Sequence, residues 1–119
     1  MQLRKGRART EVTLKAERFG DHPVIYIFNE NAHIGAVALA DYDAAHGTAS
    51  VSVITRAGHK EDLIARGAAY RVSKALQKPV CVLAGIHIDK AGPDEIRLLR
   101  RNAALVVTAF LKASAGGPS

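Results

Sequence analysis

The stretch 80-VCVLAGIHID-89 decides how the chain folds, because it predicts a buried strand that ends in two polar side chains. Successive side chains of a strand point to opposite faces. His87 and Asp89 therefore share one face with Gly85, while the apolar residues at even positions form the other face. A carboxylate beside an imidazole can fix its tautomer, and Gly85 leaves a space in which we expect a flat ligand to fit.

Four strands and a helix are predicted before this stretch, and a second helix after it. Alternation of apolar and polar residues predicts strands over 10–18 and 49–55, and mainly apolar runs predict strands over 24–28 and 33–40. Apolar residues at helical spacing predict one helix that ends before Pro79 and another that starts at residues 92–95. This order indicates an α+β two-layer domain, in which two helices cover a mostly antiparallel sheet of about five strands. The four consecutive strands suggest an antiparallel meander.

Length and composition predict a single domain over residues 1–119, with a basic N-terminal arm over 1–9 and a flexible tail over 113–119. The chain is 48% hydrophobic but contains no Trp and only three Tyr and three Phe. Aliphatic side chains must therefore fill the core. A short chain with a doubly apolar second strand also favours a homo-oligomer.

The net charge of +6 favours anionic partners, namely a small anion or an acidic protein. We do not expect nucleic-acid binding, because no set of stacking aromatic residues accompanies the basic arm. The lone Cys81 cannot form an internal disulfide, and no apolar run approaches the roughly 20 residues that cross a bilayer. We therefore expect a soluble, cytoplasmic protein without a membrane contact.

Three histidines, His33, His59 and His87, lie at predicted strand ends or at the first helix start. If these ends meet beside Asp89, the imidazoles could bind zinc or iron, but the residue spacing matches no standard metal motif and we assign no metal ligand. The segment Gly58-His59-Lys60 predicts an anion site, since a helix start offers backbone N–H groups and Lys60 adds a positive charge. The alternatives are histidines that only cap chain ends and a glycine that only permits a turn.

Three segments together resemble a known family: 33-HIGAVA-38, 52-SVITRAGHKEDLIA-65 and 84-AGIHIDKA-91. The chain is similar to the LpdD-like prenylated-flavin chaperones, the small D-type accessory subunits of gallate and UbiD-type decarboxylase systems. The resemblance implies a protein that binds prenylated FMN, in its reduced form, and assists its delivery to a UbiD-type decarboxylase. It also implies contact with the prenylated-flavin synthase and requires no catalytic residue.

Carried over to this chain, the resemblance implies a flavin site lined by His33, His59, Lys60, His87 and Asp89. The phosphate of FMN would favour Gly58-His59-Lys60, while the isoalloxazine could lie over the small surface of Gly35, Ala36 and Gly85. Few aromatic residues are present to stack on it, so we expect Tyr26, Phe28 or a second subunit to contribute.

Two other functions stay open from the sequence. The chain could be a small enzyme or a metal-binding protein that uses a cluster of His33, His59, His87 and Asp89. It could also be a purely structural subunit of a decarboxylase.

Overall fold

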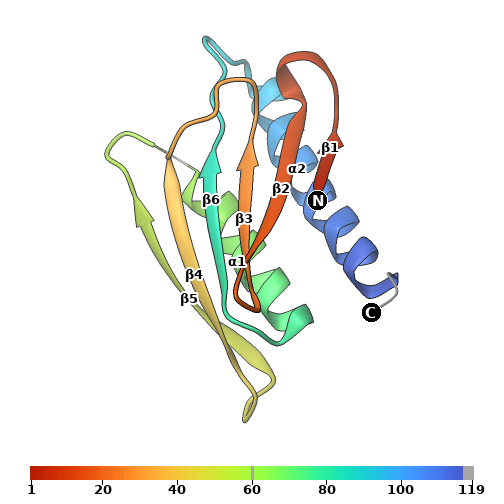
Figure 1. The fold of residues 1–119 in the computed structure, drawn as a ribbon. Helices are drawn as coiled ribbons and strands as arrows, with labels where there is room; N and C mark the ends of the chain where they lie inside the picture. Colours follow the sequence, from red (N-terminus) through yellow and green to blue (C-terminus); the bar gives the residue numbers. More distant parts are fainter. Residues whose placement is uncertain (60, 117–119) are drawn as a thin grey trace.

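The computed structural model describes residues 1–59 and 61–116, which form a six-stranded sheet and two long helices (Figure 1). The strands are β1 (Gln2–Lys5), β2 (Val12–Phe19), β3 (His22–Phe28), β4 (Ala36–Asp43), β5 (Thr48–Thr55) and β6 (Val80–Gly85). The helices are α1 (Asp62–Leu76), α2 (Pro93–Gly116) and a short 3-10 turn, η1 (Ala8–Thr10). The predicted α+β class is confirmed. The first strand was missed, because β1 lies in the segment that we predicted to be a basic arm.

The strand order is β1-β2-β3-β6-β4-β5, which corrects the predicted meander. β6 pairs parallel with β3 and antiparallel with β4, so the chain leaves β3 and crosses the end of β6 before β4 begins. The physical reason lies in the composition of β6. Every side chain of this strand is buried or half-buried, and such a strand is most stable between two others.

Both helices cover one face of the sheet (Figure 1). α1 packs against β4, β5 and β6, while α2 packs against β1 and β2 and also contacts α1. Small side chains of β4 allow α1 to approach closely, since Ala36, Ala38 and Ala40 point toward the helices and are fully buried. The two-layer architecture that the sequence predicts is therefore present.

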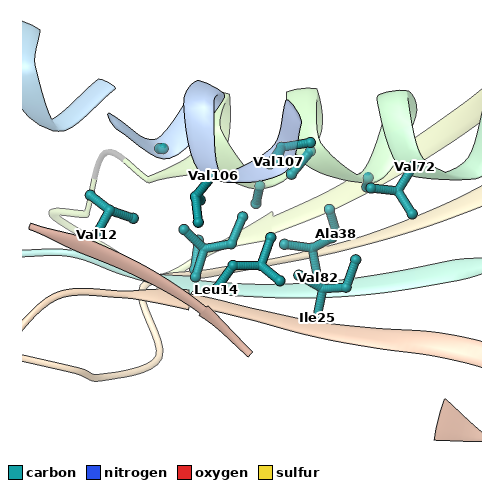
Figure 2. Packing of buried hydrophobic residues seen from close by; sticks show 14 of the residues in the cluster. Val12, Leu14, Ile25, Ala38, Val72, Val82, Val106 and Val107 are labelled. Atoms are coloured by element: carbon teal, nitrogen blue, oxygen red, sulfur yellow. The ribbon is translucent and has the colours of Figure 1, made fainter. Parts of the chain in front are cut away.

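The core lies between the sheet and the helices (Figure 2). Leu14, Ile25 and Val82 come from three neighbouring strands, and Val72 of α1 and Val106 of α2 meet them; all five are completely buried. Aliphatic side chains fill this interior, as the scarcity of aromatic residues predicts. Burying each such side chain contributes about 1.5–3 kcal/mol.

The opposite face of the sheet is not covered by either of the described helices (Figure 1). Tyr26, Leu83, Val37 and Ile54 form one row across it, because their strands pair in that register. Ile54 is 76% exposed. A homo-oligomer that covers this apolar face stays a prediction.

The ends of some elements differ from the prediction. β6 ends at Gly85, so His87 and Asp89 lie in the following loop, and β4 begins at Ala36, so His33 lies in the preceding loop. α2 continues to Gly116, beyond the point at which we expected the chain to fray, and residues 117–119 lie outside the described part. None of the described helices is long and apolar enough to span a membrane.

Candidate functional site

A buried carboxylate lies between two imidazoles at the start of α1. Glu61, the N-cap residue of this helix, has a side chain only 10% exposed. Its Oε1 is 3.5 Å from Nε2 of His33, and its Oε2 is 3.4 Å from Nδ1 of His59. The two imidazole rings lie side by side, with centroids 5.1 Å apart. One ligand atom from each of the three residues falls within 4.8 Å of the others.

Two glycines make this arrangement possible. A Cβ atom on Gly35 would collide with the carboxylate of Glu61, so only glycine leaves room for the buried acid. A Cβ atom on Gly85 would collide with the main chain of His33. The loop before β4 therefore passes directly over the end of β6 and brings His33 to α1. Arg56 fixes the end of this loop, because its guanidinium donates to Ile34 O at 2.8 Å.

The ring of His33 is held in one orientation. Its Nδ1 lies 2.7 Å from the main-chain oxygen of Asn31. A carbonyl oxygen can only accept a hydrogen bond, so Nδ1 carries the proton and donates it. In the neutral ring, Nε2 then presents a lone pair to Glu61.

The contacts of Glu61 are longer than ordinary hydrogen bonds. A charge-assisted N–H···O bond measures about 2.7–2.9 Å, whereas both imidazole nitrogens are 3.4–3.5 Å from the carboxylate. Within the described residues, Oε2 is buried and has no hydrogen-bond partner. Burying a carboxylate without a partner is costly, so Glu61 indicates a site that a positively charged group completes.

The predicted pair of His87 and Asp89 is real but lies at the surface. Nε2 of His87 is 2.8 Å from Oδ1 of Asp89, and the two side chains are 59% and 91% exposed. The main chain of His87 is held by Asn29, which donates to His87 O at 2.8 Å and accepts from His87 N at 3.2 Å. Glu61 and His87 both line a cavity of about 280 Å³ between the helix starts.

The structure thus brings together His33, Gly35 and His59, and adds Glu61, which the sequence analysis missed. Gly58 has a left-handed φ of 80° in an exposed turn before α1. Lys60 lies outside the described residues. Phosphate binding at this helix start stays a prediction, and the negative charge of Glu61 opposes it unless a cation neutralises the carboxylate.

The space that we expected directly beside Gly85 is taken up by another part of the chain. The main chain of His33 fills it, and Gly85 is buried. Ala36 is likewise buried and points toward the helices. Gly35 and Ala36 therefore offer no room for an isoalloxazine, which corrects that part of the prediction, whereas Gly85 still lines a cavity on the uncovered face of the sheet.

A shallow cavity of about 380 Å³ opens instead on the uncovered face of the sheet. It combines two aromatic side chains, a lysine and the loop that carries His33; its lining residues include Lys15, Tyr26, Phe28, Ala32, His33, Leu83 and the predicted site residue Gly85. The ammonium of Lys15 lies 5.9 Å from the centre of the Tyr26 ring. A planar ring can rest on these aromatic and aliphatic groups, and cavities of this size hold small ligands.

The free thiol of Cys81 lies on the same face of β6 as Leu83. Partial burial raises the pKa of the Cys81 thiol above its usual range. The thiol therefore stays protonated at neutral pH and is a poor nucleophile.

Comparison with known proteins assigns a family to the chain. A family model described as the prenylated flavin chaperone LpdD-like domain matches residues 6–115. Comparison with curated proteins finds no match. Among solved structures, the chain is similar to a component of a chaperone complex for yeast 20S proteasome assembly, with 14% identity and a TM-score of 0.61. That alignment covers 98% of this chain and 95% of the other, and it shows a shared fold.

Proposed function

Because the chain belongs to the family of LpdD-like prenylated flavin chaperones, we propose that it binds reduced prenylated FMN and delivers it to a UbiD-type decarboxylase. The protein acts as a carrier and does not convert the flavin. The His87 and Asp89 side chains are mostly exposed, which would give acid–base catalysis at this pair little shielding from water.

The observation that carries the proposal is the cavity on the uncovered sheet face, in a chain that the family model covers almost completely. Tyr26 and Phe28 would support one face of the isoalloxazine, and Leu83 would extend the apolar floor. His33 belongs both to this cavity and to the cluster at the start of α1. A ligand that lies on the sheet can therefore extend toward α1 by passing His33.

The bound flavin would supply the reactive ring that the client decarboxylase uses. The chain itself would contribute a binding surface, the orientation of the ring and partial exclusion of water and oxygen. A cavity that stays open to solvent suits a carrier, because the cargo must leave again.

Co-expression with a prenylated-flavin synthase tests the proposal. The protein, purified without oxygen, should carry flavin that is visible in its absorption spectrum. The double variant Tyr26→Ala/Phe28→Ala should lose most of it, because it removes the aromatic floor. Phe19→Ala is the matched control, since this aromatic residue is 80% exposed and lies outside the cavity.

Transfer is tested by mixing the loaded protein with a UbiD-type decarboxylase that lacks its cofactor. Decarboxylase activity should appear in proportion to the flavin supplied. Absence of flavin from the wild-type protein would reject the carrier role and favour the structural subunit. Turnover of the flavin by the protein alone would favour the enzyme.

A further inference from the structure

We propose that His33, His59 and Glu61 bind one divalent transition-metal ion, for which zinc is the probe. The proposal does not depend on flavin binding. It starts from the buried Oε2 of Glu61, which has no hydrogen-bond partner among the described residues and faces an imidazole nitrogen.

Two distances within the cluster are those of ligands that share an ion, and all three ligand atoms lie within 4.8 Å of one another. Nitrogen and oxygen ligands lie about 2.1 Å from zinc, so two of them in a tetrahedral site are separated by about 3.4 Å. The two imidazole nitrogens lie 3.5 and 3.4 Å from the carboxylate oxygens that they face. Each imidazole faces a different oxygen, so the carboxylate can offer one oxygen or both to an ion between the rings. The same separations are too long for strong direct hydrogen bonds.

The outer contacts of the cluster also suit a metal site. A histidine that binds a metal usually donates its other ring N–H to a carbonyl or carboxylate, which orients the ring. His33 has this arrangement, with Nδ1 donating to Asn31 O at 2.7 Å and Nε2 directed at Glu61. The absence of a Cβ atom at Gly35 leaves room for the carboxylate in this position.

The ligand types select the class of ion. Imidazole nitrogens favour zinc, iron, nickel and copper, whereas magnesium and calcium prefer oxygen ligands throughout. Three protein ligands leave at least one coordination position for water or an anionic group. Solvent can reach it, because the side chains of His33 and His59 are 24% and 26% exposed.

Calorimetric titration of the untagged full-length protein with zinc chloride, after removal of metals with a chelator, tests this site. We expect one zinc ion per chain, and no comparable binding of magnesium. Glu61→Gln, which keeps the shape of the side chain, and His33→Ala should each weaken zinc binding at least tenfold. His46→Ala is the matched control, because His46 contacts Asp43 at 2.7 Å in a fully separate, exposed turn.

A second measurement does not depend on any variant. Anomalous diffraction at the zinc absorption edge, from wild-type crystals grown with one equivalent of zinc, should show a peak bounded by His33, His59 and Glu61. The proposal is overturned if the wild type binds no zinc or if the peak lies elsewhere. It is also overturned if Glu61→Gln and His33→Ala bind zinc as tightly as the wild type, or if His46→Ala abolishes binding.

Discussion

Glu61 and Asp89 are both carboxylates beside histidines, but they lie in opposite environments. Asp89 is 91% exposed and forms one direct hydrogen bond of 2.8 Å with its histidine. Glu61 is 10% exposed and lies 3.4–3.5 Å from two histidines, and its Oε2 has no hydrogen-bond partner among the described residues. The exposed pair is satisfied by itself and by water, whereas the buried group is incomplete. The difference indicates that burial by distant parts of the fold, and not adjacency in sequence, decides which carboxylate lacks a hydrogen-bond partner.

The largest expected effect is a loss of stability when a glycine in the packed region is replaced. Gly85→Ala should lower the free energy of unfolding by about 3 kcal/mol, because the new methyl group meets the main chain of His33 in a packed region. Gly92→Ala, beside the exposed pair, should change it by less than about 0.5 kcal/mol, because no atom lies within 4 Å of the added carbon. Urea unfolding of both variants measures the difference. Equal losses would mean that the loop of His33 does not press on β6.

The second largest loss of stability is expected where a buried side chain holds the main chain of the exposed pair. Asn29 is buried and contacts both main-chain polar groups of His87. Asn29→Ala should therefore cost about 2 kcal/mol of stability, because it leaves part-buried polar groups without partners. Asn31→Ala is the matched comparison. Asn31 also donates to His87 O, at 2.8 Å, but it is exposed and water can replace it.

Thermal and urea unfolding should show that the Asn29→Ala variant is clearly less stable than the Asn31→Ala variant. The reverse order would show that the segment after β6 is held mainly from its exposed side.

The smallest effect is expected at the exposed pair itself. Asp89→Asn should change the free energy of unfolding by less than about 0.5 kcal/mol, because exposed ion pairs are weak and screened by salt. Unfolding curves at low and high salt provide the measurement. A loss above about 1 kcal/mol that disappears at high salt would contradict the view that this pair is an ordinary surface contact.

Much of the fold could be predicted because alternation and helical spacing are local signals. The strands around Val51 and Ile25 and the helix stripe through Val106 follow from these patterns. The position of β6 between β3 and β4 could not be predicted in this way. Alternation predicts which face of a strand is buried, but it does not predict which strand pairs with it.

The same limit explains the predicted length of β6. Ile86 and Ile88 continue the alternation and are buried, but pairing with the neighbouring strands ends at Gly85, and Asn29 takes over the main-chain contacts of His87. The alternation of side chains between two faces still predicted correctly that His87 and Asp89 lie together. Pattern alone does not distinguish a strand from an extended segment that is held by side chains.

Glu61 was missed for a different reason. An acidic residue at a helix start is common, because it complements the helix dipole, so the sequence carries no signal that this one is buried. Its burial depends on Gly35 and His33, which lie in a distant loop. The signal that could have found it is the combination of a glycine and a histidine in that loop with His59 two residues before the acid.

The central place of β6 also governs how the chain assembles as it leaves the ribosome. β1–β3 and β4–β5 can each form antiparallel ribbons early, but β3 and β4 gain their shared neighbour only after residues 80–85 have been made. A nascent chain shorter than this leaves the inner edges of β3 and β4 unpaired in addition to the outer edges of the sheet, and such edges are open to pairing with foreign strands. Insertion of β6 therefore closes both inner edges in a single step.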